Sequence, residues 1–179
     1  HAYKRYAELT IQLNDFYNDS EKFVKLKKIK DCYKGGDSLL SRQLTILYNS
    51  YLANQSDPDL LDRIARLKAQ VEQKFSTFRG HIKGKEVSDN KIRNILKTAT
   101  DSVKRKQAWE AAREVGAQVA DDLIRLVKLR NQAARNAGFE NYHTMSLAIE
   151  EQDAEAVARI FHKLWEMTRE TFVKIKAQA

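Results

Sequence analysis

The sequence predicts an all-α protein, an elongated multi-helix array with one very long central helix and a weaker signal for a short hairpin near residues 78–88. Two observations lead to this prediction. The 179 residues include only 6 Gly and 1 Pro, which is too few for a turn-dense β protein. Apolar residues also recur at helical spacing almost from end to end, and the hydrophobic share of 42% is enough for one core.

Four helices are expected in the first half of the chain, over about residues 3–17, 20–33, 38–51 and 58–78. Short polar side chains mark three of the starts, because they accept hydrogen bonds from the free amides of a first turn. Proline at the first helical position strengthens the third signal, since the amide hydrogen that it lacks would have no partner there. The start signals are Asp19 or Ser20, Asp37 or Ser38, and Asp57 before Pro58.

The helical pattern breaks between Phe78 and Ser88, where apolar and polar residues alternate weakly around a Gly-containing turn. This alternation is the signal for the hairpin. Ser88 is then expected to cap a helix over about residues 88–96. A short helix over about residues 142–149 and an amphipathic helix over about residues 155–175 complete the prediction.

The longest predicted helix runs from Thr100 or Asp101 to a stop at Gly138. It carries two apolar faces, so we expect burial on more than one side, with Trp109 in the core. The first face includes Trp109, Ala112, Val119, Leu123 and Val127, and the second includes Ala108, Ala111, Val115 and Leu126.

This central helix is too long for a self-contained domain. At 1.5 Å per residue it would span about 55 Å, whereas a compact globule of this size is about 40 Å across. The last helix is also still amphipathic at Phe172 and Ile175, which must lie against something. We therefore expect the chain to be the front part of a larger helical protein; an elongated bundle or an oligomer is the alternative.

The net charge of +8 is concentrated in one stretch. Residues 74–113 contain 11 basic and 4 acidic side chains, a net charge of +7. Clustered cations attract nucleic acid, anionic surfaces or acidic peptides. The simpler interpretation is a solvated helix face.

The sequence contains no signal for a membrane span or for export. No apolar run approaches the roughly 18 residues that a membrane helix needs, and no signal peptide opens the chain. The single Cys32 excludes an intrachain disulfide framework. We expect a soluble protein, and both a cytoplasmic and an exported location stay open.

The residues alone indicate no catalytic centre. None of the four histidines begins a His-Glu-x-x-His pair, which places two zinc ligands one helical turn apart. His162 and Glu166 are four residues apart on one helix face, but two ligands are too few for zinc, so an ordinary helix contact is expected. No Gly-x-Ser-x-Gly turn occurs, and the surroundings of Cys32 offer no general base. No cofactor or metal site is expected in this chain.

Several stretches resemble the N-terminal part of the angiotensin-converting enzyme family, which comprises zinc peptidyl-dipeptidases and bacterial relatives. Their order and spacing are more specific than any one of them, and they span nearly the whole chain. They are residues 42–44, 54–58, 60–64, 75–80, 92–101 and 126–139, together with the sequence Ala108-Trp109-Glu110-Ala111-Ala112-Arg113.

The resemblance implies an all-α gluzincin fold shared with the thimet oligopeptidase and oligoendopeptidase family. In that fold the N-terminal helices form a lid over a deep, narrow channel, and the zinc-binding helix comes later in the sequence. Residues 1–179 would then be the lid and part of one wall, with the catalytic zinc-binding part outside this chain. None of the family's catalytic or zinc-binding residues can be carried over to this sequence.

One residue can be carried over from the resemblance. In the chloride-activated enzymes of the family, the Arg of the Trp-Glu-x-x-Arg stretch helps to hold a buried anion, and Arg113 occupies that place here. A buried guanidinium needs a counter-charge. Ala112 replaces an aromatic residue of the animal enzymes, so we expect a structural ion pair at Arg113 in preference to a chloride site.

The sequence therefore leads to one functional hypothesis and one alternative. The hypothesis is a non-catalytic N-terminal portion of a zinc-dependent peptidase, a peptidyl-dipeptidase or an oligopeptidase, inactive by itself. Its partners would be the rest of the parent protein, which would carry the zinc, and peptide substrates, with self-association of the isolated chain. No membrane or nucleic-acid partner is expected. The alternative is a basic helical binding module for nucleic acid or for a protein.

Overall fold

The computed structural model describes residues 1–178 and confirms an all-α architecture with a small hairpin. The central helix is long and bent, and two labels cover it, so nine helices are numbered in the described residues. They are α1 (Ala2–Tyr17), α2 (Ser20–Cys32), α3 (Ser38–Leu52), α4 (Pro58–Thr77), α5 (Asp89–Thr98), α6 (Ser102–Arg113), α7 (Val115–Asn136), α8 (Tyr142–Ile149) and α9 (Ala154–Gln178), with strands β1 (Gly80–Ile82) and β2 (Lys85–Val87).

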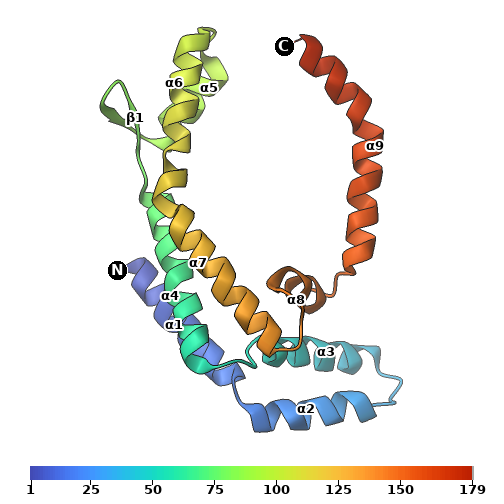
Figure 1. Ribbon diagram of the computed structural model, residues 1–179. Coiled ribbons are helices and arrows are strands. Elements are labelled where there is room, and N and C mark those ends of the chain that lie inside the picture. The colour runs from blue at the N-terminus through green and yellow to red at the C-terminus, as the bar shows by residue number, and fades with distance from the viewer. Residues whose placement is uncertain (179) are drawn as a thin grey trace.

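The helices form an open, elongated arrangement rather than a closed bundle (Figure 1). The middle of the molecule is the antiparallel pair α4 and α7, with α1 packed along α4. The pair α2 and α3 lies at one end, and the hairpin, α5 and α6 lie at the other. Helix α9 follows α8 and runs apart from α6 and α7 (Figure 1).

The predicted start signals are confirmed, and the structure decides between the paired candidates. Asp19 accepts a hydrogen bond from the amide of Lys22, and Asp37 accepts from the amides of Leu39 and Leu40. Asp101 rather than Thr100 caps α6. The aspartates cap the helices in place of the neighbouring serines and threonine, because a carboxylate accepts hydrogen bonds from the amides of the first turn and its negative charge is stabilised by the positive end of the helix.

The central helix bends at Glu114, where α6 ends and α7 begins. The backbone stays close to helical there, because the amide of Glu114 still donates to the carbonyl oxygen of Glu110 at 3.2 Å. Gly116 lies directly beside the bend, and glycine is a weak helix former at which helices often kink. The predicted stop at Gly138 is confirmed: this residue adopts a φ of +88° after the end of α7.

The two apolar faces of the central helix behave differently from one another. Ala108, Ala111 and Leu126 of the second face are buried. The first face is largely open, because Trp109 is 52% exposed and Leu123 is 46% exposed. The prediction that Trp109 lies in the core is therefore wrong for the described residues. The alanines of the central helix face the neighbouring elements because their small side chains allow close backbone approach. Large side chains such as Trp109 are left on the solvent side of the helix.

The hairpin is confirmed and docks on α6. Its turn has positive φ at both central residues, Lys83 and Gly84, which matches the twist of the two strands. Val87 joins a small core with Ile92 of α5 and with Ala108 and Ala111 of α6. Gly80 passes so close to α6 that a β-carbon there would collide with the backbone oxygen of Ala111.

A buried carboxylate ties α7 to α4. Asp122 is only 7% exposed. One of its oxygens, Oδ2, lies 2.7 Å from Lys74 Nζ and accepts a hydrogen bond from Gln70 Nε2 at 3.0 Å. The other, Oδ1, lies 3.6 Å from Arg125 Nη1. The hydrogen bond from Lys74 is the main reason that the pKa of Asp122 is lowered, and burial opposes the shift without cancelling it.

Gly80→Ala should destabilise the protein by about 1–3 kcal/mol, because the added methyl group would collide with fixed backbone of α6. Gly116→Ala is the matched control: a β-carbon there meets nothing within 4 Å, and alanine favours a helix by up to about 1 kcal/mol. Urea unfolding followed by circular dichroism compares the two variants. Equal stability of both would contradict the close approach of β1 to α6.

Asp122→Asn should lower the melting temperature at neutral pH, because Lys74 loses its buried counter-charge. The folded-state pKa of Asp122 lies below its ordinary value of 3.8. The stabilisation is therefore complete above that value and is lost as the pH falls through 3.8 toward the lower folded-state pKa. Melting curves between pH 7 and pH 3 should show a weaker acid destabilisation in the variant than in the unsubstituted chain.

Asp121→Asn is the control for this measurement, since Asp121 is exposed and makes no ion pair within residues 1–178. Its melting temperature and its pH dependence should match those of the unsubstituted chain. If Asp122→Asn behaves in the same way as this control, the carboxylate does not hold the two helices together.

Candidate functional site

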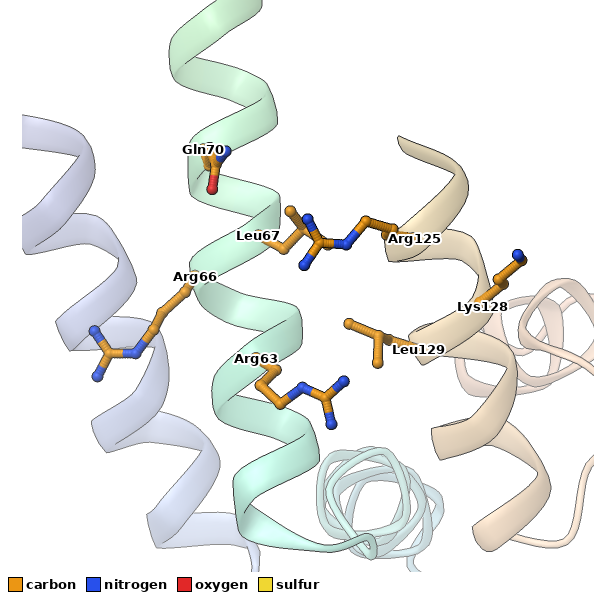
Figure 2. Close-up of a pocket in the computed structure, with 7 residues that line it drawn as sticks. All are labelled: Arg63, Arg66, Leu67, Gln70, Arg125, Lys128 and Leu129. Carbon is orange, nitrogen blue, oxygen red and sulfur yellow. The ribbon is translucent and has the colours of Figure 1, made fainter. Parts of the chain in front are cut away.

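A groove lies between α4 and α7 (Figure 2). One of its lining residues, Gln70, donates a hydrogen bond to Asp122. The volume of the groove is about 400 Å³, within the range of small-molecule sites. Four of the residues that line it are cations, two are leucines and one is an amide. They are Arg63, Arg66, Leu67 and Gln70 from α4, and Arg125, Lys128 and Leu129 from α7.

Helical spacing brings these side chains together. On α4, Arg63, Leu67 and Gln70 follow one another at intervals of four and three residues, which places them on one face. On α7, Arg125 and Leu129 are separated by four residues in the same way. The antiparallel packing of the two helices turns these faces toward a common space (Figure 2).

Leu67 and Leu129 form the apolar floor of the groove, and the four cationic side chains start from positions around this floor. Leu67 is 7% exposed and Leu129 is half-buried. Figure 2 shows Arg63 and Arg125 extending from opposite helices into the space between them, whereas Arg66 extends toward α1. Lys128 lies on the outer rim of the groove.

The positive charge of the groove is only partly compensated. Arg66 pairs with Asp62 at 3.8 Å, and Arg125 shares Asp122 with Lys74. Within the described residues, Arg63 makes no ion pair, and neither does Lys128. The lining contains four cations and no carboxylate, so the arrangement is suited to binding an anion.

This groove was not predicted from the sequence. A usable signal exists in two short patterns, Arg-x-x-Arg-Leu at residues 63–67 and Arg-x-x-Lys-Leu at residues 125–129. Each puts cations beside a leucine on one helix face. Neither pattern shows by itself that the two helices are neighbours, because that depends on packing between segments about 60 residues apart in the chain.

Arg113, the site residue expected from the sequence, is exposed at the end of α6. Its guanidinium carbon lies 5.1 Å from the centre of the Trp109 ring, a cation–π contact. No carboxylate among residues 1–178 pairs with it. The anion or ion-pair role of Arg113 stays a prediction.

His162 and Glu166 contact each other on α9, with Nε2 and Oε1 3.3 Å apart. Both side chains are exposed, so the expectation of an ordinary helix contact is confirmed. Among residues 1–178 no three His, Cys, Asp or Glu side chains are grouped so that they could hold a metal ion. The residues present here therefore do not fit a zinc site.

The basic stretch of residues 74–113 comprises the end of α4, the hairpin, α5 and α6. Part of its charge is compensated within the same helices: Arg93 Nε lies 2.6 Å from Asp89 Oδ2, and Lys106 Nζ lies 3.8 Å from Glu110 Oε1. These contacts agree with a solvated helix face. Binding of nucleic acid at this end of the molecule stays a prediction.

Large apolar side chains are exposed along several helices, and α9 is the extreme case because none of its described residues is buried. Phe172 is 66% exposed and Ile175 is 59% exposed, so the apolar face that the sequence predicts for the last helix is uncovered. The other strongly exposed apolar residues of α9 are Ile160, Phe161, Leu164, Trp165, Met167 and Val173. Within residues 1–178, no helix is long and apolar enough to cross a membrane.

Comparison with known proteins places the chain in a family. The family model described as angiotensin-converting enzyme, peptidase family M2, matches residues 3–177. No curated protein and no solved structure matched the chain. The match covers nearly every residue and agrees with the resemblance carried by residues 108–113 and 126–139, and it shows that the chain belongs to the angiotensin-converting enzyme family of peptidases.

Proposed function

We propose that residues 1–179 are the N-terminal, non-catalytic portion of a zinc-dependent peptidase, a peptidyl-dipeptidase or an oligopeptidase, and form the lid and one wall of its peptide-binding channel. The observation that carries this proposal is the family match over residues 3–177. Relation to the thimet oligopeptidase and oligoendopeptidase family belongs to the same proposal.

The uncovered apolar faces support a role as part of a larger fold. Leu13 and Phe16 of α1 are 56% and 60% exposed, and Trp165 of α9 is 52% exposed. Contiguous apolar surface of this kind usually marks a contact with another body. In the proposal, the rest of the peptidase covers these faces.

The zinc ion would be held by the rest of the peptidase. The sequence has no His-Glu-x-x-His pair, and residues 1–178 contain no group of three suitable ligands. Zinc would supply the activation of water for peptide hydrolysis. The contribution of this chain is to shape the channel and to control which substrates enter it.

Helices α2 and α3 are suited to act as the lid, because polar contacts of the pair and its flanking loops, together with one aromatic contact between Tyr17 and Tyr51, join it to the rest of the molecule. Asn18 Nδ2 donates to the carbonyl oxygens of Asn54 and Ser56, at 2.5 and 2.7 Å. Asn49 Nδ2 donates to the carbonyl oxygen of Ile149 at 3.0 Å. Hydrogen bonds of this kind are more easily exchanged for water than a packed core is.

One further contact ties the lid to the segment between α8 and α9. Arg42 of α3 pairs with Glu151, and neither residue is fully buried. A lid held in this way would limit the opening of the channel, so that flexible peptides enter and folded proteins do not. Closure would also keep bulk water away from the reacting groups.

Arg42→Ala in the zinc-loaded peptidase that contains this chain should widen the range of substrates. Loss of the pair with Glu151 releases α3, so kcat/KM for a small folded protein should rise several-fold relative to kcat/KM for a short peptide. The measurement is the ratio of the two values, which cancels any change in the amount of active enzyme.

Arg5→Ala is the matched control. Arg5 is also an exposed arginine in an ion pair with a glutamate, but its partner Glu8 lies on the same helix, at 3.6 Å. This variant should leave the ratio unchanged. If Arg42→Ala leaves it unchanged as well, helices α2 and α3 do not act as a lid.

A further inference from the structure

We propose that the groove between α4 and α7 binds a phosphomonoester, that is, a small molecule with a phosphate dianion and an apolar body. The phosphate would lie between Arg63 and Arg125, and the apolar body would rest on Leu67 and Leu129 (Figure 2). The inference goes beyond the peptidase proposal and does not depend on it.

The charge balance of the groove points to an anion. Four of its seven lining residues are cations and none is acidic. The carboxylate beside Arg125, Asp122, is already engaged by Lys74 at 2.7 Å and by Gln70 at 3.0 Å, which leaves Arg125 at 3.6 Å with a shared and longer contact. An anion between Arg63 and Arg125 would offset the repulsion between the two guanidinium groups.

The placement of the two arginines favours phosphate over carboxylate. A guanidinium group offers parallel N–H donors that match two oxygens of a bound anion. A carboxylate has two oxygens and is largely satisfied by one such group. A phosphomonoester has three terminal oxygens and a charge of about −1.5 to −2 at pH 7, so it can accept from Arg63 and Arg125 on opposite sides of the groove.

The groove is held open by the structure around it. The contact of Asp122 with Lys74 and Gln70 fixes α4 against α7 at one end of the groove. Gln70, which also lines the groove, is held by this contact. Because the helices are already in place, a ligand would order little besides the arginine side chains, which keeps the entropic cost of binding low.

The floor of the groove distinguishes an organic phosphate from the free ion. Leu67 is 7% exposed and its side chain extends from α4 toward α7, where Leu129 extends back toward it (Figure 2). A ligand with an aromatic or aliphatic body would remove apolar surface of both leucines from water. Inorganic phosphate gains nothing from this floor, so it should bind less tightly.

The test is a calorimetric titration of the chain with phenyl phosphate at low ionic strength. Saturable one-to-one binding is expected. Arg63→Gln and Arg125→Gln should each weaken it about tenfold, as expected for loss of a charge-assisted hydrogen bond. Arg135→Gln is the matched control: it removes the same charge from α7, but Arg135 is exposed and does not line the groove. Its effect should stay below about twofold.

Two further arms identify the ligand class. Inorganic phosphate and phenylacetate should both bind more weakly than phenyl phosphate. Leu129→Ala should weaken phenyl phosphate and leave inorganic phosphate unaffected. Melting curves check that each variant is folded, and Arg63→Gln is the decisive one, since Arg63 makes no ion pair within residues 1–178 whose loss could disturb the structure.

Three results would overturn the proposal. The first is an absence of saturable binding by phenyl phosphate. The second is an equal loss of affinity in Arg63→Gln, Arg125→Gln and Arg135→Gln, which would show a diffuse positive field instead of a site. The third is binding of phenylacetate as tight as that of phenyl phosphate. None of these results bears on the lid, which is tested by substrate cleavage.

Discussion

The packing of α4 against α7 depends on one buried carboxylate, Asp122, and the rest of the molecule is arranged around this pair of helices. Asp122 reaches across to Lys74 and Gln70, and the same two helices also bury small or leucine side chains such as Ala65, Leu126 and Ala134. The pair carries α1 on one side and continues through the bend at Glu114 into α6. It also forms both walls of the cationic groove. The contact of Asp122 with Lys74 and Gln70 thus stabilises the helix pair, and it holds the walls of the candidate binding site in place.

A second constraint is the amount of apolar surface that these helices leave open. The close contacts are made largely by alanines, such as Ala108 and Ala111 at 0% and 1% exposure, because their size lets neighbouring backbones approach. The large side chains, Trp165 and Phe172 among them, face outward from α9. The isolated chain therefore gains little folding free energy from burial of apolar surface. Membership of a peptidase family and uncovered faces are both accounted for if the rest of the enzyme packs against this chain.

Local features of the structure were predictable, and features that depend on distant contacts were not. Asp19, Asp37 and Asp101 could be identified as helix caps because capping depends on a few neighbouring residues. The bend at Glu114 was missed, since the helical pattern runs through it unbroken. The choice of buried face was missed at Trp109, where two apolar faces compete and tertiary packing decides. The groove required knowing that residues 63–67 face residues 125–129, which neither pattern shows alone.

If the uncovered faces of this chain are contact surfaces within a complete peptidase, the tryptophan side chains on these faces are shielded from solvent there. Trp109 and Trp165 are the two tryptophans of the chain, and both are 52% exposed. Acrylamide quenching of Trp165 fluorescence in a Trp109→Phe background, measured in the isolated chain and in the complete enzyme with its other tryptophans replaced, tests the claim most directly. Strong quenching in the isolated chain and marked protection in the enzyme are the predicted results. Equal quenching in both would show that α9 faces solvent in the enzyme too, and would contradict the account.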